Sequence, residues 1–375
     1  MNIDTIEAYV VRVSEKTDWT MIRVAAGDGL VGWGEATLFG YGALLSAFCA
    51  HFNRGLRGRG EQDVLAALAI DERTQAGMLS SAVRTAVDQA LWDIRGQRIG
   101  CAVHALLGGA KRDAIPAYAN VNRGTVDRDP EGFAASALAA CEAGFDAIKI
   151  APFDGVVPGE IATRAMRTAL DLGLERVRAV RQAIGAGRRL MIDCHYRLTP
   201  AAAHQVLREL EPVGLYWFEC PIPESPDLFP ALQEIHQAAN ANGVLLAGAE
   251  DFSGCKGFLP FVHQRIYDVI MPDIKYCGGL LEMLSITAMA NAAGIAVSPH
   301  NPTGPVAHAA SLHACAAMPA VFLLEHQLGE SPLFFSLAGP VAPSRDGSFP
   351  IPQGPGLGVA IDEALLREHS RATDA

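Results

Sequence analysis

The chain has 375 residues, of which 50% are hydrophobic and 19% are charged, and its formal net charge is −11 at neutral pH. This length exceeds that of an ordinary single domain, so we expect one large barrel with an appended domain, or two domains. The negative charge and the lack of a basic stripe in the sequence argue against nucleic acid as a partner. Because an acidic protein binds an anionic substrate only through local cations, a metal ion or a few lysines and arginines are expected at its site.

The eight cysteines are scattered between Cys49 and Cys315 and form no Cys-x-x-Cys pair. Disulfide frameworks are typical of small secreted chains, so we expect reduced thiols and a cytoplasmic protein. The N-terminus has acids at Asp4 and Glu7 where a signal peptide would have a basic region and an apolar run. No uninterrupted apolar stretch reaches about 18 residues, so neither a membrane span nor a membrane partner is expected.

The first third of the chain indicates a mixed domain. Residues 6–13 and 20–26 are rich in β-branched side chains, and Asp28-Gly29 predicts a hairpin turn before a strand over 30–35. From about residue 44 to 106 the apolar spacing becomes helical. We therefore predict an α+β capping domain over residues 1–113.

From residue 114 onward, short apolar runs alternate with amphipathic stretches. Eight such runs in series predict a parallel (β/α)8 barrel of the TIM type over residues 114–328. A doubly wound sheet is the alternative, although the series shows no obvious switch point. Residues 329–375, with Pro355-Gly356-Leu357-Gly358, are expected to return to the capping domain. The predicted strands are 115–120, 147–151, 190–195, 215–219, 244–250, 269–273, 295–300 and 322–325.

Seven of these eight strands end in, or just before, an ionisable residue. The active sites of barrel enzymes lie at the C-terminal ends of the strands, so this placement favours function over a simple exit of the chain into solvent. The residues concerned are Lys149, Asp193 with His195, Glu219, Glu250, Asp273, His300 and Glu325.

Three of these residues are carboxylates on consecutive strands, namely Asp193, Glu219 and Glu250. Neighbouring strands of a barrel lie about 4.8 Å apart. Carboxylates this close repel one another unless a cation lies between them. An all-oxygen site suits a hard ion such as Mg²⁺, with water and substrate oxygens completing its coordination. Surface acids paired with lysine or arginine are the alternative, but apolar strand residues come directly before each acid.

The next two strands end in Asp273 and His300, so these side chains can meet. A carboxylate bonded to one ring nitrogen fixes the tautomer and raises the basicity of the other nitrogen, as a general base requires. His195 lies two residues after the first carboxylate and therefore shares its face of the strand. Lys149 faces the same cavity. Lys275 is either a substrate contact or a solvated loop lysine.

In order and spacing, these residues resemble the mandelate racemase branch of the enolase superfamily, and within it acid-sugar dehydratases such as galactonate and mannonate dehydratases. The resemblance covers nearly the whole chain. It includes Gly32-Trp33-Gly34-Glu35, residues 88–94, Met271-Pro272-Asp273 with Gly278-Gly279, Ser298-Pro299-His300-Asn301-Pro302 with Gly304-Pro305, and Pro355-Gly356-Leu357-Gly358.

The resemblance implies a role for each strand-end residue. The three carboxylates would bind Mg²⁺, and Asp273 with His300 would form the general-base dyad. Glu325 would hydrogen-bond the enolate side of the intermediate, and His195 would protonate the departing hydroxyl. The expected function is therefore the Mg²⁺-dependent dehydration of an aldonate or aldarate to a 2-keto-3-deoxy acid.

Two departures from the family pattern bear on this expectation. Racemases of this branch carry Lys-x-Lys on the second strand, whereas Lys149 is followed two residues later by Ala151, which disfavours racemisation at carbon 2. Lys149 is expected near the substrate carboxylate. Cys220 follows Glu219 where many relatives have a second acid. An epimerase that uses His195 or Lys149 as its second acid or base, and a non-catalytic binder of sugar acids, are the alternatives.

Substrate specificity is expected to come from loops of the first domain, around residues 17–19 and 38–41. Trp19, Phe39 and Tyr41 are candidate walls of the substrate cavity, and Lys275 is a candidate contact. The sequence does not choose among gluconate-like, galactonate-like and aldarate-like acids. A small carboxylate is the expected ligand, and an assembly of identical subunits is the expected state.

Overall fold

The computed structural model describes residues 2–15, 17–60, 63–64, 66, 77–158, 163–339 and 343–370. The helical periodicity predicted over residues 44–106 therefore lies partly outside the described residues. Among the residues that are described, no helix combines the length and the hydropathy needed to cross a lipid bilayer.

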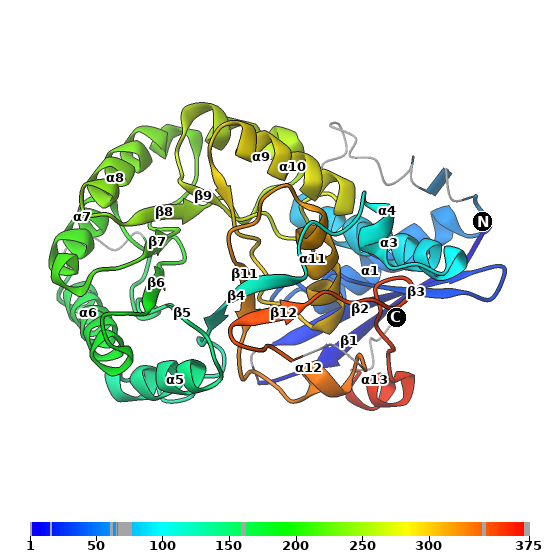
Figure 1. The fold of residues 1–375 in the computed structure, drawn as a ribbon, viewed down its shortest axis with the longest axis horizontal. Coiled ribbons are helices and arrows are strands. Elements are labelled where there is room, and N and C mark those ends of the chain that lie inside the picture. Colours follow the sequence, from blue (N-terminus) through cyan, green and yellow to red (C-terminus); the bar gives the residue numbers. More distant parts are fainter. Residues whose placement is uncertain are drawn as a thin grey trace.

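A three-stranded antiparallel sheet begins the chain. Strands β1 (Ile3–Arg12), β2 (Asp18–Ala26) and β3 (Val31–Glu35) are paired in chain order. Helices α1 (Gly42–Leu56) and α3 (Gly77–Ile99) pack on this sheet, and their buried apolar side chains form one core with those of the strands. This α+β unit, the cap, lies beside the barrel (Figure 1).

Eight parallel strands form the barrel. Pairing runs in chain order from β4 to β10, and β11 pairs with β4. Phe322 N donates to Val297 O at 2.8 Å and Ser298 Oγ donates to Leu323 O at 2.6 Å, so hydrogen bonds also join the segments around β10 and β11. The strands are β4 (Ala114–Asn120), β5 (Ala147–Ile150), β6 (Arg189–Asp193), β7 (Trp217–Glu219), β8 (Leu245–Gly248), β9 (Val269–Ile270), β10 (Ala296–Val297) and β11 (Leu324–Gln327).

The predicted (β/α)8 fold with a cap is thus confirmed, and the doubly wound alternative is wrong. Several strands are shorter than predicted because the backbone leaves the sheet before the apolar run ends. In β8, for example, the strand ends at Gly248, and the next residue, Ala249, has a left-handed φ of 62°.

Helices surround the strands, and several begin at polar capping side chains. Asp129 accepts from Gly132 N at 2.7 Å, Thr163 from Met166 N at 3.0 Å, and Thr199 from Ala202 N at 3.2 Å. Figure 1 shows α5 to α9 as an arc outside β5 to β8. The helices are α5 (Pro130–Glu142), α6 (Arg164–Ile184), α7 (Pro200–Glu209), α8 (Phe229–Ala241), α9 (Gly254–Gln264), α10 (Leu280–Ala292) and α11 (Pro305–Ala317), with short 3-10 turns η1 (Glu211–Val213) and η2 (Pro226–Leu228).

The last part of the chain runs from the barrel to the cap. It contains α12 (Leu333–Ser336), β12 (Ser348–Pro350), which pairs with the start of β4, and α13 (Glu363–His369). Leu357 N donates to Asp93 Oδ1 at 2.8 Å, next to the short helix α4 (Val103–Leu106). The C-terminal segment therefore packs on the cap, as the fold prediction requires.

The motif Gly32-Trp33-Gly34-Glu35 joins the cap to the barrel. A Cβ on Gly34 would lie 1.9 Å from Ala86 O, so only glycine allows β3 to lie directly on α3. Glu35 is fully buried, and its carboxylate accepts from Thr303 Oγ1 at 2.6 Å, Gly304 N at 2.8 Å and Ala307 N at 3.0 Å. The loop that follows β10 is thus anchored to the cap.

Candidate active site

The main candidate site is a cavity of about 460 Å³ between the cap and the C-terminal ends of the barrel strands. Below it the barrel is filled with large side chains, since the rings of Tyr118 and Trp217 meet edge to face at 5.2 Å. The cavity is lined from the cap by Thr17, Thr37, Leu38, Phe39, Tyr41, Gly77, Met78 and Leu79, and from the barrel by Arg123, Asp251, Lys275, Tyr276, His300 and Pro302.

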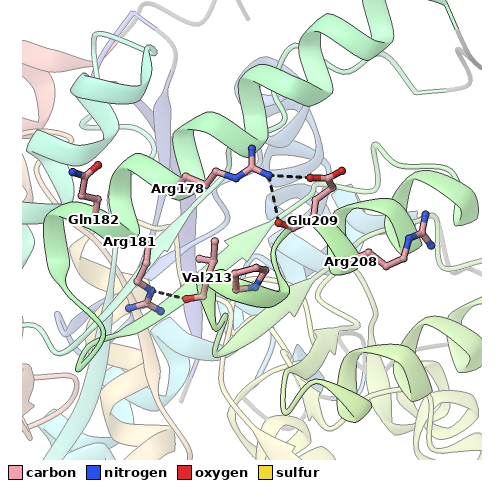
Figure 2. Close-up of a pocket in the computed structure, with 7 residues that line it drawn as sticks. Arg178, Arg181, Gln182, Arg208, Glu209 and Val213 are labelled. Carbon is pink, nitrogen blue, oxygen red and sulfur yellow. Dashed lines mark hydrogen bonds and ion pairs between the residues drawn. The ribbon is translucent and has the colours of Figure 1, made fainter.

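A second cavity, of about 640 Å³, lies outside the barrel between α6 and α7 (Figure 2). Arg178 Nη2 lies 3.0 Å from Glu209 Oε2, and Arg181 Nε donates to Val213 O at 2.9 Å, so these arginines have partners. None of the site residues predicted from the sequence lines this cavity. Of those residues, His300, Lys275 and Tyr41 line the cavity under the cap.

The three predicted metal ligands are buried at the cavity end of the barrel. Asp193 and Glu219 are direct neighbours in the register of β6 and β7, and Glu250 follows β8 by two residues. Lys149, at 0% exposure, places its Nζ 2.5 Å from Glu219 Oε1 and 3.9 Å from Asp193 Oδ2. The three carboxylates thus lie at the same end of the barrel on consecutive strands, and a lysine lies against two of them.

The charge state of these carboxylates fits a cation site. Burial raises the pKa of Glu219 well above its usual range, and Lys149 only partly opposes this. Burial also raises the pKa of Glu250, and the nearby Asp193 and Glu219 raise it further. The Oε2 atoms of both glutamates are buried without a hydrogen-bond partner. A hard cation would satisfy such oxygens, and Mg²⁺ prefers this donor set.

The described residues do not hold a preformed cluster of three or more metal-ligating side chains. In the present arrangement Lys149 supplies the positive charge instead. Burial lowers the pKa of Lys149, but Glu219, Glu325 and Asp193 outweigh burial and raise it well above its usual value. Lys149 is therefore a cation within the carboxylate group.

Glu325 lies on the other side of this lysine. Its Oε1 is 3.1 Å from Lys149 Nζ and accepts from Asn120 Nδ2 at 2.6 Å, while its Oε2 accepts from Asn301 N at 2.9 Å. Burial raises the pKa of Glu325, but Lys149 and the other donors outweigh it and hold the pKa at about 2. Glu325 is consequently an ionised hydrogen-bond acceptor in this arrangement.

Asp273 and His300 form the predicted pair. Asp273 Oδ2 lies 2.7 Å from His300 Nδ1, and Tyr276 OH lies 3.3 Å from the same nitrogen. Burial raises the pKa of Asp273, but Lys275 and His300 outweigh it, so the net shift is downward. An ionised Asp273 favours the proton on Nδ1, which leaves Nε2 as the basic atom. This Nε2 lies 3.6 Å from Glu250 Oε2.

Lys275 is part of this pair's surroundings. It is only 2% exposed, it lines the cavity, and its Nζ lies 2.5 Å from the same Asp273 oxygen that His300 contacts. The solvated-loop interpretation of Lys275 is therefore wrong, and its role as a substrate contact stays a prediction.

His195 lies beside the first carboxylate. Its Nε2 is 2.8 Å from Asp193 Oδ2, and its backbone N–H donates to Asp193 Oδ1 at 2.8 Å. Burial raises the pKa of Asp193, but His195 and Lys149 outweigh it and lower that pKa. The His195 side chain is 47% exposed, so it can reach a ligand that lies over the carboxylates.

The predicted cavity walls are only partly as expected. Phe39 and Tyr41 line the cavity and are 64% and 50% exposed, so they present large apolar surfaces to it. Trp19 does not line this cavity. It is 1% exposed, packs against Phe334, and a Cβ on Gly304 would come within 2.8 Å of it. Trp19 therefore belongs to the packing between cap and barrel, because its side chain faces inward from β2.

Sequence reasoning missed several polar groups near the site, among them Arg123, Tyr276, Asp251 and Glu224. Arg123 lines the cavity and pairs with Glu330 at 3.2 Å, and Tyr276 contacts His300. Arg123 lies three residues beyond β4, the one strand with no ionisable residue at its end, and this spacing was an available signal. Glu224 contacts three segments around the carboxylates, but its position in an irregular loop gave no comparable signal.

Comparison with known proteins places the chain in a family. The family model described as "Mandelate racemase / muconate lactonizing enzyme, N-terminal domain" matches residues 8–108, and "Enolase C-terminal domain-like" matches residues 132–365. A D-galactonate dehydratase of Pectobacterium atrosepticum is 30% identical over 363 residues, covering 94% of this chain and 91% of that protein. A D-gluconate dehydratase of Thermoproteus tenax is 29% identical over 371 residues, covering 96% and 72%.

Solved structures show the same architecture. A mandelate racemase/muconate lactonizing enzyme from Jannaschia sp. CCS1 has a TM-score of 0.87 at 25% identity and covers 100% of this chain and 99% of its own. A 3,6-anhydro-D-galactonate cycloisomerase from Zobellia galactanivorans has a TM-score of 0.84 at 26% identity, covering 99% and 100%. The chain belongs to the mandelate racemase and muconate lactonizing enzyme branch of the enolase superfamily, which confirms the resemblance seen in its motifs.

Proposed function

We propose that this protein is a Mg²⁺-dependent hydro-lyase that converts an aldonate or aldarate into a 2-keto-3-deoxy acid. The observation that carries the proposal is the joint placement of a base and an acid around one group of carboxylates. His300 reaches Glu250, and His195 contacts Asp193. Relatives named as dehydratases of gluconate and galactonate support the same chemistry.

Asp193, Glu219 and Glu250 would hold the metal ion. When bound, the ion supplies positive charge to the substrate carboxylate, which makes the neighbouring α-proton more acidic. Lys149 adds a second positive charge beside these groups, and Glu325, once it carries a proton, donates a hydrogen bond to the enolate side.

The reaction needs two proton transfers, and a different histidine carries out each one. His300 Nε2 takes the α-proton, since Nδ1 is fixed by Asp273. His195 gives a proton to the β-hydroxyl, because hydroxide leaves poorly without one. The C–O bond breaks as water departs, and the resulting enol becomes the keto acid. The net change is the loss of one water molecule.

The test is a panel of acid sugars assayed for keto acid, with and without a chelator. We expect keto-acid formation from at least one acid, loss of activity on chelation, and recovery with Mg²⁺ or Mn²⁺. Because Ala151 provides no second base, no epimer at carbon 2 should accumulate. Interconversion of epimers without keto acid would replace dehydration by epimerisation. Ligand binding without any α-proton exchange would indicate a non-catalytic binder.

We also propose that the enzyme is cytoplasmic and that it assembles from identical subunits. All eight cysteines are free in the structure, which supports a reducing compartment. Sedimentation of the purified chain measures the assembly directly, and a monomer at micromolar concentration would contradict that part of the proposal.

A further inference from the structure

The chain leaves all three carboxylate-bearing strands through left-handed residues that are not glycine. After β6, His195 and Tyr196 have φ values of 46° and 59°, after β7, Cys220 has a φ of 44°, and after β8, Ala249 has a φ of 62°. Such conformations are strained for residues other than glycine and persist only where the surroundings hold them. Ala249 comes directly before Glu250, so its conformation sets the direction of that carboxylate.

One side chain contacts the segments after β6 and after β8. Glu224, in the loop after β7, accepts from Ala249 N at 2.6 Å and from Tyr267 OH at 2.6 Å, both on Oε1. Its Oε2 lies 3.3 Å from Tyr196 OH, which donates to it. The carboxylate thus joins the end of β6, the end of β8 and Tyr267, which lies two residues before β9.

The packing around this carboxylate is tight. A Cβ on Gly248 would come 2.6 Å from Glu224 Oε1 and 2.5 Å from Tyr267 Cζ, so glycine alone fits at that position. Tyr267 is itself 1% exposed and is fixed by stacking on Phe261 at 5.8 Å. Glu224 is therefore held in a defined place, from which it can hold Ala249.

We infer that Glu224 is a positioning residue that holds Glu250, and with it the segment after Asp193, in the arrangement that binds the metal ion. This inference rests on the proposed function, because it takes Asp193 and Glu250 as metal ligands. Without the carboxylate, Ala249 N–H loses its acceptor and the left-handed turn loses its support. The backbone then relaxes toward an ordinary φ, which turns Glu250 away.

The three donors explain why an acid fits this position. A carboxyl group offers two oxygens to one amide and two hydroxyls, whereas glutamine offers a single oxygen. Glutamine can keep the bond to Ala249 N while its amide donates to the hydroxyl of Tyr196. Glu224→Gln should consequently retain much of the metal affinity that Glu224→Ala loses.

The experiment measures Mn²⁺ affinity by electron paramagnetic resonance on the full chain without substrate. Loss of a group that supports a metal ligand typically weakens metal binding by about 10- to 100-fold, and we expect this for Glu224→Ala. Glu224→Gln should lose less than about tenfold, which is the rescue that a positioning role predicts. Tyr267→Phe keeps Glu224 and removes one of its hydrogen-bond donors, so it should also weaken Mn²⁺ binding. This variant tests the inference if Glu224→Ala does not fold.

Glu282 provides a matched control. Its Oε1 also accepts a backbone N–H at 2.6 Å, that of Cys255, and it is half-buried like Glu224, but it lies on α10 away from the carboxylates. Glu282→Ala should lower thermal stability and leave Mn²⁺ affinity unchanged. Equal Mn²⁺ affinity in wild type, Glu224→Ala and Tyr267→Phe overturns the inference about Glu224 but leaves the proposed function standing. A wild type that binds no Mn²⁺ overturns the proposed metal site and the inference with it.

Discussion

The two walls of the cavity under the cap differ in nearly every physical property. The barrel wall is the strand-end group of Lys149, Asp193, Glu219, Glu250, Asp273, His300 and Glu325. Of these, His300 lines the cavity itself, and the others are buried and joined to one another by short polar contacts. The cap wall includes the largely apolar residues Leu38, Phe39, Tyr41, Met78 and Leu79. Of these, Phe39 is 64% exposed and Tyr41 is 50% exposed.

This difference indicates that the two walls have different roles. Buried charges in low dielectric act strongly on a reacting group, and their mutual contacts keep them in place. Exposed apolar side chains have weaker mutual contacts and gain burial only when a ligand covers them. The barrel wall should therefore control the rate of the chemical step, and the cap wall should control binding.

The largest effect is expected at the base. His300→Asn removes the proton acceptor, so turnover should fall by about 10⁴-fold and exchange of the substrate α-proton with deuterium oxide should stop. Asp273→Asn should lower both by about 10²-fold, because the imidazole loses its orienting partner. Proton magnetic resonance of the substrate in deuterium oxide measures the exchange. Exchange that persists in His300→Asn would assign the base to another residue, with Lys149 as the first to examine.

A somewhat smaller and more selective effect is expected at the acid. In His195→Asn, keto-acid formation should fall by about 10³-fold, since the leaving hydroxyl loses its proton donor. The α-proton should continue to exchange through His300. Measuring both rates on one sample separates the two histidines. A parallel loss of exchange and elimination would mean that His195 serves α-proton removal, and the epimerase interpretation would gain support.

The barrel wall should also be sensitive to acid because a neutral histidine lies next to it. Burial lowers the pKa of His326 to about 4, although Glu325 opposes the shift. Below the ordinary histidine pKa of about 6.5 the unfolded chain gains a proton that the folded chain does not bind until near pH 4, so stability falls as pH falls. About 2 kcal/mol should be lost between pH 7 and pH 5 through this group.

The variant His326→Phe isolates that contribution. The ring of His326 stacks on Phe145 at 6.0 Å and lies 4.8 Å from Phe349, so a phenyl ring suits these surroundings. Urea unfolding at pH 7 and pH 5 should show a smaller loss of stability in the variant than in the wild type. Identical losses in both proteins would show that His326 is not kept neutral by burial.

The smallest effect is expected on the cap wall. Phe39→Ala should raise KM by about tenfold with little change in kcat, because it removes apolar surface that the substrate covers. Leu44 is the control, since it is an exposed apolar residue of α1 at 50% exposure that does not line the cavity, and Leu44→Ala should change neither constant. A fall in kcat for Phe39→Ala with an unchanged KM would contradict the division between the two walls.

The same comparison explains what could be predicted from the sequence. A strand has a period of two and the strands of a barrel are parallel, so an ionisable residue after an apolar run is placed by geometry alone. Asp273 and His300 were paired on this basis, and the structure places them 2.7 Å apart. Their assigned roles and those of the three carboxylates stay predictions that the variants above test.

Loop residues were harder to place because no period governs them. Trp19 was predicted to face the substrate cavity, but it lies on β2 and packs inward, while Thr17 lines the cavity instead. Glu224 acts across three segments that are distant in sequence, and only folded coordinates bring these together. The contact of Lys275 with Asp273 was likewise undecided from sequence, since burial could not be read from its position two residues past a strand end.

The anchoring of Glu35 has a consequence for protein engineering. Its carboxylate holds Thr303, Gly304 and Ala307, the segment that begins three residues after His300. A barrel excised from its cap, or transplanted under a cap from another protein without a matching acid, would leave three donors of this segment unsatisfied. Exchange of caps to change the substrate should therefore keep β3 with the barrel and replace only the loop that carries Leu38 and Phe39.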